Sequence, residues 1–174
     1  MPAGKRRMPR RNPPDTADRS GILLFGLIAL LLLPLPAEPA QSVRPSAKDK
    51  CPVCGMFVSE YKEFLAEIVF KDGSHAYFDG PKDMFRFYFE PEKHLPGRKR
   101  GDIVSIYATE YYSLETIDAF EARFVVGSDV RGPMGDELIP IAKESDARTF
   151  LKDHKGKSIL RFKQVTLELV NSLD

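Results

Sequence analysis

Three sulfur-bearing side chains lie within six residues of this 174-residue chain, and they are the residues best suited to chemistry. The run Cys-Pro-Val-Cys-Gly-Met at residues 51–56 holds both of the chain's cysteines and one of its five methionines. Thiolates and thioethers are soft ligands, and Cu(I) prefers such ligands. Because this run opens the part of the chain that we expect to fold, the sulfurs are predicted to lie at the edge of a domain rather than in its core.

A further sulfur, that of Met134, belongs to the run Gly-Pro-Met-Gly-Asp at residues 132–136, which has no periodic apolar neighbours. This methionine is therefore predicted to be exposed and available to a metal, with the carboxylate of Asp136 two residues further on. Met84 differs, because it recurs with other apolar residues at helical spacing and is predicted to belong to the core. Met56 could bind a metal or fill a gap in the core, and both interpretations stay open.

The two cysteines also allow other interpretations. In an oxidising compartment, two close cysteines can form a disulfide. A Cys-x-x-Cys pair is also typical of thiol–disulfide oxidoreductases, although the sequence shows neither the preceding strand nor the following helix of such a site. A structural zinc site would need two more ligands at matching spacing, and the sequence offers only three isolated histidines, His75, His94 and His154.

The first 40 residues indicate export. Six lysines and arginines precede an apolar run from Ile22 to Leu33, which is nearer the length of a signal-peptide core than the ~20 residues of a membrane span. Ala37 and Ala40 are possible cleavage points, and an uncleaved anchor is the alternative. No cysteine ends the run, so the usual bacterial lipid-attachment signal is missing. We predict a signal peptide or N-terminal anchor over residues 1–40, and a periplasmic location or one on the outer face of the cytoplasmic membrane.

The rest of the chain is predicted to form one domain after a short linker. Residues 41–50 are polar and contain a proline, as linkers do, and residues 51–174 suit a single hydrophobic core. Residues 41–174 contain 20 lysines and arginines against 22 aspartates and glutamates, which gives a net charge of −2. This balance excludes the strongly basic surface that is typical of a nucleic-acid-binding protein.

A weak internal repeat predicts the fold class. In the first half we expect strands at residues 56–59, 64–70, 76–78 and 103–108, with a helix that begins at Pro81 before the last of them. In the second half we expect strands at residues 124–126 and 138–141 around an irregular loop at 131–135, then a helix through Ala147 and Phe150, then a β-rich segment at 160–169. Two ββαβ units with antiparallel hairpins form an α+β architecture, with helices on one face of each sheet.

Several separated motifs resemble those of the NosL family. They are Cys-Pro-Val-Cys-Gly-Met-Phe-Val from residue 51, Phe-Asp-Gly-Pro-Lys-Asp-Met-Phe from 78, Ala-Thr-Glu-Tyr-Tyr-Ser from 108, Phe-Val-Val-Gly-Ser-Asp from 124 and Gly-Pro-Met-Gly from 132. The resemblance covers about residues 50–170 and follows one order throughout. Members of this family are accessory copper chaperones of nitrous-oxide reductase, and their fold is related to that of alkylmercury lyase.

The resemblance implies an exported, non-enzymatic metallochaperone for Cu(I). Its ligands would be Cys51, Cys54, Met56 and Met134, with Asp136 at the place where the family often has a histidine. A carboxylate is harder than the ligands that Cu(I) prefers, which shifts the expected site toward sulfur. The copper would pass to nitrous-oxide reductase or to the machinery that assembles its copper centres, and the N-terminal segment could associate the protein with the membrane.

Two enzymatic functions remain as alternatives to the chaperone interpretation. A periplasmic thiol–disulfide oxidoreductase would use Cys51 and Cys54 as its redox pair. An alkylmercury-lyase-like enzyme, suggested by fold kinship alone, would need converging thiols and an acid such as Asp79 or Asp136. No histidine lies close in sequence to Cys54 to act as a general base, which favours metal transfer over turnover.

Overall fold

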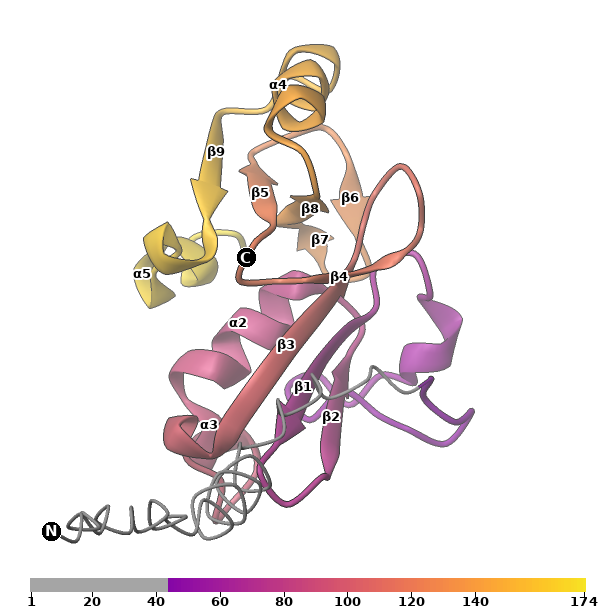
Figure 1. Ribbon diagram of the computed structural model, residues 1–174, viewed down its shortest axis with the longest axis vertical. Helices are drawn as coiled ribbons and strands as arrows, with labels where there is room; N and C mark the ends of the chain where they lie inside the picture. Colours follow the sequence, from indigo (N-terminus) through magenta and orange to yellow (C-terminus); the bar gives the residue numbers. More distant parts are fainter. Residues whose placement is uncertain (1–43) are drawn as a thin grey trace, which may run out of the picture. The chain divides into compact units, whose positions relative to one another are not determined.

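The computed structural model describes residues 44–174, and these contain two ββαβ units (Figure 1). The first unit consists of β1 (Ala66–Phe70), β2 (His75–Phe78), α2 (Pro81–Phe89) and β3 (Ile103–Thr109). The second consists of β5 (Arg123–Val126), β8 (Ile139–Ile141), α4 (Glu144–Asp153) and β9 (Ser158–Arg161). The predicted α+β class with two ββαβ units is confirmed.

The two main sheets are antiparallel and share one strand order. In the first sheet the order is β2-β1-β3, and β4 (Thr116–Asp118) extends it beyond β3. In the second sheet the order is β8-β5-β9. In both units the first strand is therefore central, and the helix that follows the second strand packs on the sheet, α2 against β1 and β2 and α4 against β5, β8 and β9.

Short elements connect and cover these units. They are α3 (Pro91–His94), α5 (Leu167–Asn171), the hairpin of β6 (Arg131–Gly132) and β7 (Gly135–Asp136), and 3-10 turns at Val58–Glu60, Arg100–Asp102 and Phe162–Gln164. The β6–β7 hairpin replaces the irregular loop expected at residues 131–135, and Met134 lies in its two-residue turn.

Prolines set both ends of α2. Pro81 occupies the first turn, where its missing N–H would have no helical partner. Glu90 precedes Pro91 and has φ −130° and ψ 55°, outside the helical region, as the ring of a following proline favours. Between these ends Met84 and Phe85 are fully buried, so the prediction that Met84 belongs to the core is confirmed.

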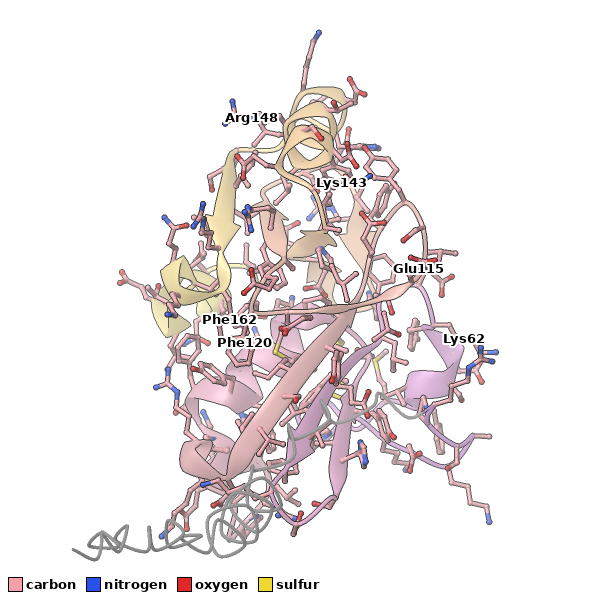
Figure 2. All side chains as sticks on the ribbon, in the orientation of Figure 1. Lys62, Glu115, Phe120, Lys143, Arg148 and Phe162 are labelled. Atoms are coloured by element: carbon pink, nitrogen blue, oxygen red, sulfur yellow. The ribbon has the colours of Figure 1, made fainter. Side chains whose placement is uncertain are left out.

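Aromatic rings join the two units through one core. The ring centroid of Phe85 on α2 lies 5.0 Å from that of Phe124 on β5 and 4.8 Å from that of Phe162, which follows β9. Phe120 packs on Phe162 from the other side, at 4.6 Å between centroids, and Figure 2 shows these two rings together near α5. Helix α2 is thus held by contacts with both units.

Two predicted strand segments are wrong. Residues 56–59 form no strand; Phe57 makes a single bridge to Lys50, and the chain then turns through Val58–Glu60. The β-rich segment predicted at 160–169 ends with β9, which is followed by the 3-10 turn at Phe162–Gln164. The side chain of Thr166 then accepts a hydrogen bond from the backbone N–H of Leu169 and caps α5. Alternating apolar residues there belong to a turn followed by a helix.

The N-terminal predictions fall mostly outside the described residues. The signal peptide or anchor at 1–40 lies there entirely, and the boundaries at residues 40 and 50 stay predictions. Among residues 44–174, no helix has both the length and the apolar character needed to cross a membrane. Asp49 and Lys50, the last residues of the predicted linker, already pair with Val58 and Phe57.

Candidate metal centre

The Cys-Pro-Val-Cys-Gly-Met run forms a closed loop. The backbone N–H of Cys51 donates to the carbonyl of Met56 at 2.9 Å, and the N–H of Gly55 donates to the carbonyl of Cys51 at 2.9 Å. Gly55 has φ +80°, a left-handed conformation that glycine adopts without steric cost. The Lys50–Phe57 bridge closes the base of the loop, so its sulfurs are held by backbone hydrogen bonds before any metal binds.

The loop turns its first cysteine inward. Cys51 is only 1% exposed and belongs to the hydrophobic core, whereas Cys54 is half-buried. The prediction that both sulfurs lie at the domain edge is therefore wrong for Cys51, since the loop packs that side chain against the core. Both cysteines are free thiols in this structure.

Two buried carboxylates complete the cluster. The Sγ of Cys54 donates to Oδ1 of Asp79 at 3.2 Å, and the Sγ of Cys51 donates to Oδ2 of Asp83 at 3.3 Å. Asp79 directly follows β2 and Asp83 lies in the first turn of α2, and both are nearly inaccessible to solvent. The four ligand atoms lie within 4.8 Å of one another, close enough to hold one metal ion.

Sequence analysis missed Asp83 and considered Asp79 only as a candidate acid. Both occur in the Phe-Asp-Gly-Pro-Lys-Asp-Met-Phe motif, but acidic residues are common at helix N-termini because they interact favourably with the helix dipole. The signal that could have found them is the position of Asp79 between a predicted strand and a helix-starting proline. Their sequence separation of 25 and 32 residues from the cysteines hides the contact until the chain folds.

The surroundings keep both thiols protonated. Burial raises the pKa of Cys51 far above its usual range, and burial likewise raises the pKa of Cys54 to about 12. Backbone N–H groups of Cys54 and Met56 oppose these rises by hydrogen bonding to the sulfurs, while Asp79 and Asp83 add to them. A metal ion that binds here must displace the thiol protons, because the thiolate is the ligand.

The methionine hairpin is attached to the same end of α2. The Nζ of Lys82 donates to the carbonyl of Met134 at 2.6 Å, and Lys82 directly precedes Asp83. The side chain of Met134 is 42% exposed, which confirms the prediction of an exposed methionine. The hairpin therefore brings Met134 toward the helix end that carries the carboxylates.

Glu137, the residue that follows the hairpin, is buried and links it to the start of α2. Oε1 of Glu137 accepts the backbone N–H of Lys82 at 2.6 Å and that of Leu138 at 2.8 Å. A Cβ on Gly80 would collide with the Glu137 carboxylate, so a larger residue at the start of α2 would displace this side chain from its hydrogen bonds. Burial raises the pKa of Glu137 to about 8. Sequence analysis did not single out Glu137.

The other two predicted ligands occupy different settings. Met56 is half-buried inside the cysteine loop, and its backbone carbonyl bonds Cys51. Asp136 is half-buried on β7 and forms an ion pair with Arg131 across the hairpin. A metal would have to compete with Arg131 for this carboxylate. Their assignment as ligands, like that of the cysteines and Met134, stays a prediction.

The histidines lie in other places. Nδ1 of His75 is 2.5 Å from Oε1 of the buried Glu67, and Nδ1 of His154 is 3.2 Å from Oδ1 of Asp129. His94 packs on a phenylalanine ring, and burial lowers its pKa. Within residues 44–174, the group of side chains able to hold a metal contains no histidine.

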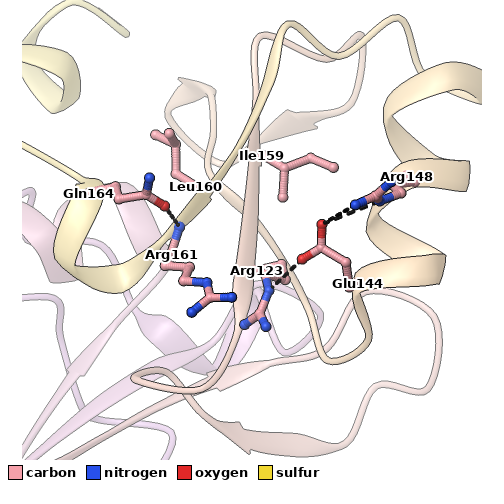
Figure 3. Close-up of a pocket in the computed structure, with 7 residues that line it drawn as sticks. All are labelled: Arg123, Glu144, Arg148, Ile159, Leu160, Arg161 and Gln164. Carbon is pink, nitrogen blue, oxygen red and sulfur yellow. Dashed lines mark hydrogen bonds and ion pairs between the residues drawn. The ribbon is translucent and has the colours of Figure 1, made fainter.

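A separate hollow of about 460 Å³ lies on the second unit (Figure 3). Glu144 at its wall accepts hydrogen bonds from Nε of Arg123 at 2.7 Å and Nε of Arg148 at 3.3 Å. Arg161 faces Arg123 across the β5–β9 pair. The remaining lining residues are Ile159, Leu160 and Gln164. This basic hollow shares no residue with the thiol cluster and offers no sulfur, so the cluster is the candidate metal centre.

Comparison with known proteins identifies the family of the chain. The NosL family model matches residues 42–170. The copper-binding lipoprotein NosL of Stutzerimonas stutzeri is 30% identical over 138 residues, which cover 76% of this chain and 72% of the relative.

Solved structures are also similar. The crystal structure of the copper chaperone NosL from Shewanella denitrificans matches with a TM-score of 0.62 and 26% identity, over 75% of this chain and 98% of that one. The solution structure of apo-NosL from Achromobacter cycloclastes matches with a TM-score of 0.45 and 23% identity, over 60% and 87% of the two chains. The family match extends over most of the chain and includes the whole thiol cluster. The chain therefore belongs to the NosL family.

Proposed function

We propose that this chain is an exported, non-enzymatic chaperone that binds Cu(I) through Cys51 and Cys54 and transfers it to a copper enzyme. The observation that carries the proposal is the convergence of both thiols in one cluster, held by a closed loop. Soft thiolates match the ligand preference of Cu(I). The names of the relatives, a copper-binding lipoprotein and a copper chaperone, support the same metal.

Methionine ligands would complete the site and permit transfer. Met56 lies in the same loop, and the hairpin with Met134 is fastened to α2 through Lys82. A thioether is neutral and needs no deprotonation to bind a metal. Because Met134 is 42% exposed, the sulfur of an acceptor protein can approach the copper on its side. An incoming ligand then binds before an old one leaves, and no free ion forms.

Anaerobic titration of the reduced domain with Cu(I) against a competing chelator tests the site. Replacement of Cys54 by serine should lower the Cu(I) affinity at least about tenfold, which is roughly 1.4 kcal/mol. Met84→Leu is the matched control, because Met84 is a fully buried core residue and its loss should alter stability rather than binding. Unchanged affinity in both Cys54→Ser and Cys51→Ser would refute the assignment.

Transfer is tested separately from binding. The rate of Cu(I) transfer from the loaded domain to an apo-acceptor should exceed the rate of spontaneous Cu(I) dissociation, because transfer by ligand exchange does not pass through the free ion. Nitrous-oxide reductase, or a component that assembles its copper centres, is the acceptor that we propose. A deletion strain should accumulate copper-poor reductase, and normal copper content in that strain would contradict this choice of acceptor.

The oxidoreductase alternative requires a reactive thiolate. The raised pKa of Cys54 opposes it, because a nucleophilic cysteine is activated by a lowered pKa. Metal-free reduced protein should therefore catalyse disulfide exchange in a model substrate no faster than an equal concentration of a simple dithiol. Clear catalysis combined with slow copper transfer would favour the oxidoreductase.

Export is tested by the location and the N-terminal sequence of the mature chain. The lipoprotein relative and the apolar run from Ile22 to Leu33 support export. We expect a folded domain outside the cytoplasm, either released after Ala37 or Ala40 or held by the uncleaved segment. A cytoplasmic chain that begins at Pro2 would contradict the proposal.

A further inference from the structure

Two arginines lie directly opposite each other on the second sheet. Arg123 on β5 and Arg161 on β9 are partners in the antiparallel register, and Figure 3 shows both guanidinium groups directed to the same side of the sheet. Like charges at directly opposed positions of two strands lower the stability of a sheet. An anion bound between the two guanidinium groups would offset this repulsion.

The two arginines differ in the bonds that they form. Arg123 is 20% exposed, and it donates to the Glu144 carboxylate at 2.7 Å and to the carbonyl of Glu121 at 2.7 Å. The guanidinium of Arg161 is exposed, and within residues 44–174 it donates no hydrogen bond and forms no ion pair. A fixed arginine thus lies beside one whose N–H donors are available to a ligand.

A second hollow, of about 490 Å³, adjoins the basic hollow of Figure 3. The two hollows share Arg123, Arg161 and Gln164, so the arginine pair lies between them, and we call them together the basic trough. Four cationic side chains and two carboxylates line this trough, those of Arg123, Arg148, Arg161 and Lys163 and those of Glu121 and Glu144. The trough is therefore locally positive, although residues 41–174 carry a net charge of −2.

The lining of the trough fits a segment of another protein. Arginine and aromatic residues are enriched at protein–protein interfaces, and here Phe120 lines the second hollow and is 40% exposed. The half-buried Ile159 and Leu160 line the first hollow. A guanidinium can donate two parallel hydrogen bonds to one carboxylate. A carboxylate on a flexible side chain can also reach the recessed Arg123 more readily than a flat membrane surface can.

We infer that the basic trough binds an acidic segment of a partner protein. Carboxylates of that segment bond Arg161 and Arg123, and an apolar side chain of the same segment packs against Phe120. This interaction goes beyond the proposed function, because the trough shares no residue with the thiol cluster and needs no copper.

A labelled synthetic peptide, Glu-Glu-Leu-Glu-Glu, is the probe for this surface. Fluorescence anisotropy with the full-length protein should show saturable binding that weakens as the salt concentration rises. The matched peptide Gln-Gln-Leu-Gln-Gln should bind at least about tenfold more weakly. Equal binding of the two peptides, or no binding of the glutamate peptide at low salt, would overturn the inference.

An arginine variant and a matched lysine variant locate the binding. Arg161→Gln should weaken binding of the glutamate peptide about threefold to tenfold. It should not lower the thermal midpoint of unfolding, because the repulsion between the opposed arginines is also lost. Lys152→Gln removes the same charge from an exposed position of α4 outside the trough and should change the affinity by less than about twofold. Equal weakening in both variants would show a response to net charge alone and would overturn the inference.

Two further measurements distinguish the trough from other surfaces. On addition of the glutamate peptide, the backbone amide resonances of Arg123, Ile159 and Arg161 should shift in the wild-type protein, and shifts confined to residues outside the trough would overturn the inference. Binding to vesicles of phosphatidylcholine and phosphatidylglycerol without binding to the peptide would instead assign the surface to a membrane. The Cu(I) affinity of Arg161→Gln should equal that of the wild type, so failure of this inference and failure of the proposed function are separate results.

Discussion

The two ββαβ units have the same topology, but the acidic residue in the first turn of the helix is buried in one unit and exposed in the other. Helix α2 begins at Gly80 and Pro81, with Asp83 buried in its first turn. Helix α4 begins after Lys143, and Lys143, Glu144 and Arg148 are exposed; Figure 2 labels Lys143 and Arg148 beside this helix. The same scaffold therefore presents buried acids in one unit and a solvated charge network in the other.

The two units differ in the segments that contact the start of the helix, rather than in the sheet on which the helix packs. The cysteine loop and the methionine hairpin both contact the start of α2, through Asp83 and Lys82. Glu144, the first residue of α4, instead accepts hydrogen bonds from Arg123 and Arg148 beside an open hollow. The candidate metal centre thus depends on added loops rather than on the repeated fold itself.

The two units should differ most in the free energy of unfolding that is lost when the fifth residue of each helix is replaced by alanine. Phe85→Ala in α2 should lower the free energy of unfolding by about 3 to 5 kcal/mol, because a fully buried ring that joins both units is lost. Arg148→Ala in α4 should cost at most about 1 kcal/mol, since it removes one exposed ion pair. Chemical denaturation of both variants measures this, and similar losses would contradict the described burial.

The residue that precedes each helix gives a second matched pair. Gly80→Ala should destabilise the protein by about 1 to 3 kcal/mol, because the new Cβ collides with the Glu137 carboxylate. Lys143→Ala at the same place in α4 should change stability by less than about 0.5 kcal/mol. Thermal unfolding compares them. A neutral Gly80→Ala would mean that Glu137 does not pack against the start of α2.

Two glutamates should affect stability with opposite dependence on pH. Burial raises the pKa of Glu137 from 4.5 to about 8, so between these values the folded state binds more protons than the unfolded state. Its contribution to stability should fall as pH rises from 5 to 7, by about 1 kcal/mol per pH unit. Denaturation of Glu137→Gln at several pH values should show a flatter profile, and an unchanged slope would be evidence against this assignment.

Glu144 provides the contrast, because its hydrogen bond from Arg123 lowers its pKa. Its stabilising effect is present above the unfolded pKa of about 4.5 and is lost as pH falls through the folded value. Glu144→Gln should therefore lower the free energy of unfolding at neutral pH and have little effect in acid. A variant with its main effect in acid would contradict the ion pairs drawn in Figure 3.

The smallest predicted effect concerns thiol reactivity. Asp79 helps to raise the pKa of Cys54, so Asp79→Asn should lower that pKa, and each unit of decrease raises the thiolate fraction about tenfold. Alkylation by iodoacetamide at pH 8 should become faster in the metal-free protein. Asp146→Asn, at the equivalent position to Asp83 in α4, is the control and should leave the rate as it is. A rate that does not respond to Asp79→Asn would exclude its contact with Cys54.

The sequence predicts most of the framework because its local signals are strong. Pro81 and the apolar spacing after it place α2, and the repeated order of hairpin, helix and strand gives the fold class. Predictions fail where a local cap or turn overrides an apolar alternation, as at Val58 and Thr166. In both places, hydrogen bonds rather than side-chain pattern decide the conformation.

The candidate site is predictable only in part. Cys51 and Cys54 are apparent because both lie in one short run. Their partners Asp79 and Asp83 are placed by the β1–β2 hairpin and by the packing of the loop on α2, which no spacing rule reveals. Burial of Cys51 was likewise beyond prediction, since cysteine beside a polar linker gives no sign of entering the core.

X-ray absorption spectroscopy at the copper edge of the Cu(I)-loaded protein tests the central claim most directly. We predict a nearest shell made of sulfur alone, and a loss of sulfur from that shell in Cys54→Ser. Cu(I) would then use Cys51, Cys54 and a thioether while Asp79 and Asp83 stay unbound. A shell dominated by nitrogen or oxygen, or one that is the same in Cys54→Ser, would contradict the assignment of this cluster as the copper-binding site.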